Sequence, residues 1–166
     1  MANQNIGTPR FYTDQINFLM SRGIGQDGNF DVITGANLIG IQTGSEAELF
    51  DMRPLNKVDF DTSANTSDHV LINIDTQSTS TKKSFVAILN HNTVSADAKI
   101  LIKASNTEAH VQAVNMGSAT AMDTPVEVVN ADAIASSIVT PATDGSTIIK
   151  FTEQSLRYWG IQFEGN

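Results

Sequence analysis

The 166-residue sequence predicts an all-β fold, a β-sandwich preceded by a short N-terminal arm and helix. Short apolar runs recur along the chain, and segments rich in Ser, Thr, Asn and Asp separate them. Short strands that alternate with turn residues are typical of sandwiches and barrels. Two runs carry most of this prediction: residues 84–92, which end in a polar His-Asn corner, and residues 157–163, which contain the single tryptophan. We expect both to be buried strands of one sandwich.

The composition excludes several classes of protein. The chain has no cysteine, which excludes a disulfide scaffold, a thiolate zinc site and a cysteine nucleophile. A formal net charge of −8 repels phosphate backbones, so we expect no nucleic-acid partner. No apolar run approaches the roughly 20 residues of a membrane span, and the polar start leads us to expect no signal peptide. One domain that buries roughly 70% of its unfolded surface is the simplest expectation at this length.

Residues 13–22 predict a short helix. Thr13 is a residue type that caps helix N-termini, and Gly23 stands where a helix stop belongs. Three apolar residues then share one helix face at the spacing i, i+3 and i+4: Ile16, Leu19 and Met20. A helix of about ten residues is too short to be stable alone. Its apolar face must therefore pack on its own sandwich or on a neighbouring subunit.

The chain is expected to divide into residues 1–28, an arm with a short helix and a hinge, and residues 29–166, the sandwich domain. Gly23 to Gly28 matches the spacing G-x-G-x-x-G, but it follows a helix instead of a strand, so we interpret it as a hinge and expect no cofactor. An apolar set precedes this joint: Phe11, Tyr12, Phe18 and Leu19. These residues either pack on their own domain or form an assembly interface with a neighbouring subunit.

Apolar runs after residue 28 predict the strands of the sandwich. The expected strands are residues 38–41, 70–74, 85–89, 99–103, 126–129, 148–151 and 158–163. Residues 70–74 partly alternate, as in a half-buried strand, whereas residues 85–89 are continuously apolar, as in a strand covered on both faces. Helical turns are considered at residues 46–52 and 131–137. The expected core residues are Phe85, Ile88, Ile100, Ile102, Trp159 and Ile161.

Two stretches resemble the middle of discoidin-like, galactose-binding-type jelly rolls. In residues 85–92 a strand leads to a polar corner, and in residues 99–106 the next strand ends in a serine before a turn. Arg157-Tyr158-Trp159 is similar to that family's late strand, where an Arg-aromatic pair begins a buried run. The opening, residues 5–12, resembles the N-termini of virion structural proteins of marine tailed phages, which often carry such a sandwich. The resemblance covers about half of the chain, and its motifs concern packing and not catalysis.

The chain departs from that pattern after its last strand. Such sandwiches usually continue with at least one more strand, whereas this sequence stops at Asn166. We therefore expect that the fold is trimmed, that the chain is part of a longer product, or that a partner completes the sheet, because an uncovered strand edge invites unwanted pairing.

The resemblance implies a non-enzymatic virion protein, made in the host bacterial cytoplasm and most simply a head decoration (cement) protein. Its partners would be other virion proteins, capsid or tail subunits, in a homo-oligomer or another multi-copy assembly. The N-terminal arm and the sheet edges would make the contacts, with no membrane involved.

The alternative is a glycan-binding module on the tail or a fibre, used for host adsorption. Four loops would then carry the sugar contacts: residues 61–69, 76–83, 90–98 and 104–110. These loops contain no aromatic residue, which weighs against this alternative.

The three histidines give no catalytic or metal-binding pattern. His91 stands between two asparagines, with no acidic residue or serine adjacent to it. We interpret it as a corner residue whose ring and flanking amides form hydrogen bonds in the loop, although distant partners stay possible. His69 and His110 are far apart in sequence and lack metal-ligand spacing, which favours structural or exposed roles.

Four aspartates surround one polar loop: Asp59, Asp61, Asp68 and Asp75. Carboxylate oxygens are calcium ligands, but the spacing is not that of an EF-hand and the closing Glu is missing. A solvated loop is therefore the main interpretation, and a calcium site is the alternative.

Two carboxylate pairs invite comparison with glycoside hydrolases: Glu153 with Glu164, and Asp144 with Glu153. Such a pair must lie roughly 5 to 10 Å apart in a cleft, and nothing in the sequence brings either pair together. We expect no catalytic residue. Tyr158 and Trp159 alternate faces on a strand, and Trp159 is assigned to the core in preference to a sugar-binding platform.

Overall fold

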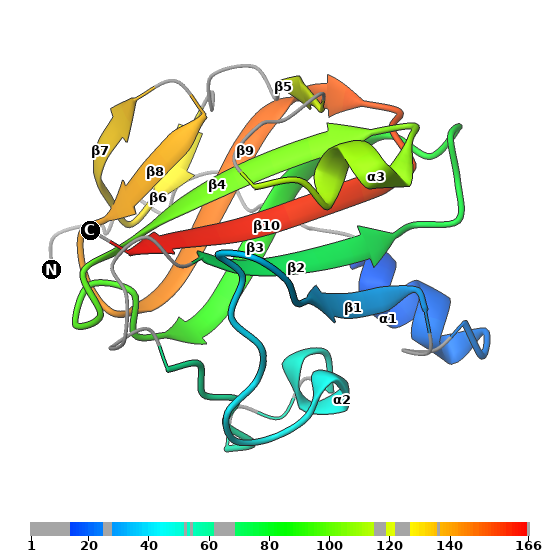
Figure 1. The fold of residues 1–166 in the computed structure, drawn as a ribbon. Coiled ribbons are helices and arrows are strands. Elements are labelled where there is room, and N and C mark those ends of the chain that lie inside the picture. Colours follow the sequence, from blue (N-terminus) through cyan, green and yellow to red (C-terminus); the bar gives the residue numbers. More distant parts are fainter. Residues whose placement is uncertain are drawn as a thin grey trace, which may run out of the picture.

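The computed structural model describes residues 14–24, 28–51, 53, 55–61, 69–114, 119–121, 127–135 and 137–165 (Figure 1). The elements in chain order are α1 (Gln15–Ser21), β1 (Phe30–Ile33), α2 (Glu46–Leu49), β2 (His69–Asp75), β3 (Lys83–His91), β4 (Ala98–Ser105), α3 (Glu108–Val111), β5 (Thr120–Ala121), β6 (Glu127–Val129), β7 (Ala131–Ala135), β8 (Ile138–Pro141), β9 (Gly145–Gln154) and β10 (Tyr158–Gly165).

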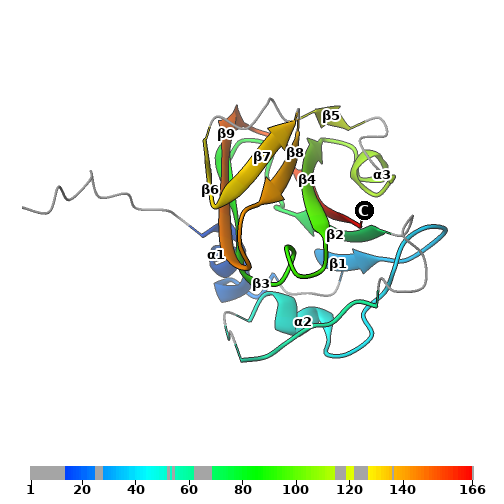
Figure 2. The ribbon, with the colours of Figure 1, turned by 90° about the vertical axis from the view of Figure 1, so that its left-hand side faces the viewer.

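The strands form two antiparallel sheets packed face to face, which confirms the predicted all-β sandwich. The large sheet has the order β1-β2-β10-β4-β8-β7, with β5 pairing to β4, and the small sheet has the order β3-β9-β6. Figure 1 shows β3 and β9 behind β4 and β10. α3 lies in front of the large sheet, on the side of the molecule opposite to β6 and β9 (Figure 2).

The core lies between the two sheets and is built by alternation along the strands. Ile161 of β10 pairs with Ile72 of β2 on one side and with Ile102 of β4 on the other, so one face of the large sheet is a continuous apolar layer. Trp159 stacks on Phe151 of the small sheet with ring centroids 5.2 Å apart, and its Nε1 donates to the carbonyl oxygen of Leu156 at 3.0 Å. Four of the expected core residues are buried here: Ile100, Ile102, Trp159 and Ile161.

The last strand is not at an edge of its sheet. β10 occupies the centre of the large sheet and pairs along its length with β2 on one side and β4 on the other. The order of strands in the sheet differs from their order in the chain, because β3 crosses to the small sheet before β4 returns. The last strand therefore needs no partner chain to cover its edges.

The continuous apolar run in β3 does not mean burial on both faces. β3 is an edge strand of the small sheet, and Val86 and Ile88 pack against the core. Phe85 is half-buried and Leu89 is 57% exposed, on the face that points away from the core. The prediction failed because an apolar run shows which side chains are apolar, not whether a second layer covers both faces of the strand.

α1 packs on its own sandwich. Its N-cap is Asp14, whose side chain accepts a hydrogen bond from the backbone N–H of Asn17 at 3.1 Å; the expected cap, Thr13, lies outside the described residues, as do Phe11 and Tyr12. Leu19 is 4% exposed and belongs to the core, so its side chain is not free to contact a neighbouring subunit, as one interpretation of the sequence required. Phe18 is 50% exposed beneath the guanidinium of Arg22.

Three smaller expectations have different outcomes. The helical turn expected in residues 46–52 forms as α2. The turn expected at residues 131–137 is wrong: Ala131–Ala135 is strand β7, which pairs with β8, because tertiary pairing overrides the helix preference of its alanines. Residues 38–41 form isolated bridges at Leu38 instead of a strand.

We predict that Trp159→Ala lowers the free energy of unfolding by about 3 to 5 kcal/mol, because it removes the ring that bridges the two sheets. Urea unfolding monitored by circular dichroism measures this loss. The matched control is Tyr158→Ala, since Tyr158 is half-buried on the other face of the same strand and should cost less. Equal losses for the two variants would contradict the placement of Trp159 between the sheets.

Candidate assembly surface

The outer face of the small sheet carries exposed apolar side chains. Strand register places Ala87, Ile148 and Val129 in one row across β3, β9 and β6, on the face opposite to the core residue Ile149. Leu89 and Phe85 flank this row along β3. We call this set of residues the outer apolar patch: Phe85, Ala87, Leu89, Val129 and Ile148. Leu89 is 57% and Val129 46% exposed, whereas Phe85 and Ile148 are half-buried.

The outer face of the large sheet is covered at its centre, in contrast. α3 packs on β4 and β10, and its Glu108 accepts a hydrogen bond from Asn73 Nδ2 at 3.0 Å. Gly160 makes this close cover possible, because a Cβ at that position would lie 2.9 Å from Lys103 Cε and 3.0 Å from the carbonyl oxygen of Val111. Three polar side chains are fully buried beneath the cover: Asn73, Lys103 and Gln162.

Lys103 is the buried cation of this covered face. Its Nζ donates to the carbonyl oxygen of Ala113 and to Gln162 Oε1, the latter at 3.2 Å, and Gln162 Nε2 donates to Glu164 Oε1 at 3.0 Å. Burial lowers the pKa of Lys103 to about 8, and the negative charge of Glu164 opposes part of that shift. The sequence alone does not reveal this residue, because a lysine that follows the apolar run of residues 100–102 looks solvent-facing.

The edges of both sheets are poor surfaces for adding a neighbour's strand. The backbone N–H of Val32 in edge strand β1 donates to Glu46 Oε1 at 2.7 Å, so α2 already satisfies it. The register of β3 shifts on either side of residues 85–88, β7 shifts after Ala131, and β6 has three residues. Bulged, short or covered edges resist pairing with other chains. The outer apolar patch is therefore better suited to contact than the edges.

His91 is a structural bridge at the end of β3. The backbone N–H of Thr93 donates to His91 Nδ1 at 3.4 Å, which leaves the ring proton on Nε2 to donate to Thr147 Oγ1 at 2.8 Å. Burial lowers the pKa of His91, and the negative charge of Asp144 only partly opposes this, so the ring is neutral at pH 7. Of the other histidines, His110 Nδ1 lies 3.2 Å from Ser105 Oγ, and His69 is half-buried at the start of β2.

The three described aspartates of the suggested calcium loop have separate partners. Asp75 forms an ion pair with Arg157, and Asp61 accepts a hydrogen bond from Gln42 Nε2 at 3.3 Å. The backbone of Asp59 forms an isolated β-bridge with that of Thr43. Asp68 lies outside the described residues. Within the described ranges, no group of three His, Cys, Asp or Glu side chains has the geometry to hold a metal ion.

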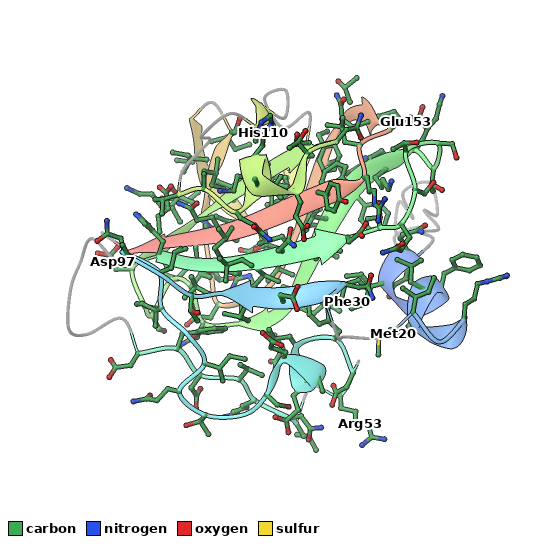
Figure 3. The ribbon with its side chains drawn as sticks, turned by 45° about the vertical axis from the view of Figure 1, so that its right-hand side comes forward. Met20, Phe30, Arg53, Asp97, His110 and Glu153 are labelled. Carbon is green, nitrogen blue, oxygen red and sulfur yellow. The ribbon has the colours of Figure 1, made fainter. Side chains whose placement is uncertain are left out.

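The suggested carboxylate pairs are also separate. Glu153 of the small sheet projects outward (Figure 3) and pairs with Lys82 at 2.9 Å, whereas Glu164 belongs to the large sheet. Asp144 accepts from the backbone N–H groups of Val94 and Ser95. Hydrogen bonds from Ser95 lower the pKa of Asp144, so this carboxylate is an ionised structural acceptor.

A polar cluster closes the end of the sandwich where β2 stops and β10 begins. Arg157 Nε and Nη2 donate to the two carboxylate oxygens of Asp75, each at 2.7 Å, and these hydrogen bonds raise the pKa of the guanidinium. The same guanidinium lies 4.9 Å from the ring centroid of Tyr158. Asn106 Oδ1 accepts from the backbone N–H of Arg157 at 3.1 Å.

Three of the four loops expected for a sugar site divide between the two ends of the sandwich, and residues 62–68 of the fourth lie outside the described residues. Asp75, Tyr158 and Ser105 are in register, so the loops at residues 76–83 and 104–110 lie at the end closed by Arg157. The loop at residues 90–98 lies at the opposite end, where Asp97 is seen in Figure 3. One site built from all four loops is therefore not formed.

Comparisons with protein-family models, with curated proteins and with solved structures returned no match for this chain. No helix in the described segments is long and apolar enough to cross a membrane.

We predict that the stability of the protein rises between pH 7 and pH 9.5 through Lys103. Its folded pKa of about 8 is below the ordinary 10.5, so in this interval the unfolded chain binds more protons and deprotonation favours the folded state. The contribution is roughly 2 kcal/mol. Urea unfolding at pH 7 and at pH 9.5 measures the free energy of unfolding at each end of the interval. The Lys103→Met variant should not show the rise.

The control for that prediction is Lys99→Met, a substitution on the same strand that leaves Lys103 in place and should keep the rise. Parallel pH profiles for the wild-type protein and Lys103→Met would show that Lys103 is not desolvated.

Proposed function

We propose that this chain is a non-enzymatic structural protein of a tailed-phage virion, most simply a head decoration protein present in many copies. The observation that carries the proposal is the outer apolar patch. Clustered exposed apolar side chains mark protein contact sites, and this patch includes Leu89 and Val129, two of the most exposed large apolar side chains in the described structure. The resemblance of residues 5–12 to virion proteins supports the placement on a phage particle.

The contacts in this proposal come from the outer apolar patch and from the N-terminal arm, whose residues Phe11 and Tyr12 lie outside the described residues. Phe18 adds an exposed aromatic ring on α1. The sheet edges, which the sequence also suggested, have a smaller part because they are bulged, short or covered. Neighbours of this kind are other virion subunits or further copies of this chain.

We also propose that the sandwich is of the discoidin-like jelly-roll type. Three features support this assignment: β3 ends in the corner formed by Asn90, His91 and Asn92, β4 ends at Ser105, and Arg157 precedes β10. A fold of this type hosts many functions, so it adds no weight to any particular partner.

A glycan-binding module on the tail or a fibre is the second candidate function. It is favoured by the cluster at one end of the sandwich, where Arg157 covers the ring of Tyr158 next to Asn106 and Gln77. Planar, hydrogen-bonding side chains beside an aromatic ring are common in sugar sites. Selective binding on a glycan array, abolished by Tyr158→Ala, would favour this function over decoration.

Immunogold labelling of intact phage particles with an antibody against this chain tests the proposed function. We expect label spread over the head, at many sites on each particle. Label confined to the tail or fibres would favour the adsorption function instead. No label on any particle would contradict the virion assignment.

A further inference from the structure

The outer apolar patch is one row of side chains wide where it crosses the small sheet. Its central row, Ala87, Ile148 and Val129, crosses all three strands of the small sheet, and Leu89 extends the row along β3. The neighbouring row carries two charged residues: Lys150 lies in register between Phe85 on one side and Glu127 on the other. Burial of such a row releases roughly 25 cal/mol for each Å² of apolar surface. An occupant must therefore supply apolar side chains in a narrow segment.

Residues 1–13 have the composition of that occupant. They include Ile6, Phe11 and Tyr12, and Arg10 is their one charged side chain. The complete chain carries a formal net charge of −8, so this segment is the cationic and apolar end of an acidic molecule. Association between two whole bodies is opposed by their like charges, whereas association of this segment with a body is not.

The position of Asp14 makes such a contact feasible. Asp14 is the N-cap of α1, and Leu19 holds α1 on the core. Figure 2 shows α1 on the same side of the molecule as β3 and β9, the side on which the outer apolar patch lies. Thirteen residues span roughly 45 Å when fully extended. The segment thus begins on the correct side and is long enough to reach across to an adjacent copy.

We infer that residues 1–13 of one copy dock on the outer apolar patch of a neighbouring copy. This inference rests on the proposed assembly function and names the surface that receives the arm. Each copy then gives one arm and accepts one, which is a head-to-tail contact that closes into rings or extends into arrays. The contact also covers Leu89 and Val129 without requiring any sheet edge to pair.

Cross-linking between two single-cysteine variants tests this contact, because the chain has no cysteine of its own. One full-length variant carries Thr8→Cys in the arm, and the other carries Ala87→Cys at the centre of the patch. The matched control carries Ala109→Cys on α3, an exposed alanine on the opposite side of the molecule. The Thr8→Cys variant carries a C-terminal fusion tag that makes it larger, the variants are mixed in pairs with a short bismaleimide, and the heterodimer is quantified on denaturing gels by its intermediate size.

We expect the pair with Ala87→Cys to cross-link about tenfold faster than the pair with Ala109→Cys, because docking raises the effective concentration of the two thiols. Equal rates would overturn the inference. A double variant, Thr8→Cys with Ala87→Cys, that closes within single chains at high dilution would also overturn it, since the arm would then occupy its own patch.

Sedimentation velocity separates failure of this contact from failure of the proposed function. Multimers of the wild-type chain combined with equal cross-linking rates would leave the assembly function standing and remove the arm as its agent. If the chain is monomeric and the antibody against it labels no phage particle, both the arm contact and the proposed assembly function are overturned.

Discussion

The pairing of β10 with β2 on one side and with β4 on the other is the constraint on which the rest of the structure depends. β10 brings Trp159 and Ile161 to the inner face, where they meet the small sheet, and Gly160 and Gln162 to the outer face. The last strand of the chain thus completes the centre of the large sheet. Such long-range pairing is slow to form, because the loop between β4 and β10 must close first.

That strand also accounts for the difference between the two outer faces. Because Gly160 has no side chain, Lys103 lies across β10 and α3 closes over it. The central strands of the large sheet, β4 and β10, are therefore buried on both faces, whereas the small sheet keeps exposed apolar residues on one. A protein that acts alone in solution gains nothing from such a patch, since exposed apolar area promotes association. The asymmetry of the sandwich is the physical basis of the proposed assembly function.

The sequence predicted the strands that have a strong apolar run or that alternate apolar and polar residues. The residues of β2, β4 and β10 were assigned to strands, and Ile100, Ile102, Trp159 and Ile161 are in the core. Sheet order was not predictable, because the same runs are compatible with β10 at an edge or at the centre. The pairing partner of a strand is a tertiary property that no local pattern contains.

The sequence shows part of the candidate surface, the apolar run of residues 85–89, but the run was interpreted as a strand covered on both faces. Leu89 and Phe85 belong to the most apolar run of the chain, and their exposure could not be told from burial by periodicity alone. Leu19 was assigned correctly to one helix face, but the choice between its own core and a neighbour needed the structure. The burial of Lys103 depends on Gly160, which is 57 residues away in sequence and adjacent only after the sheet has formed.

The central claim is that the outer apolar patch joins copies of this chain, and a matched pair of charge substitutions tests it most directly. Leu89→Asp places a carboxylate in the patch, and Leu55→Asp places one at another exposed leucine, which is 92% exposed between α2 and β2. Sedimentation velocity over a range of concentrations measures the self-association of each full-length protein. The account predicts that the wild-type chain and Leu55→Asp form multimers while Leu89→Asp stays monomeric. Identical association of all three proteins would contradict it.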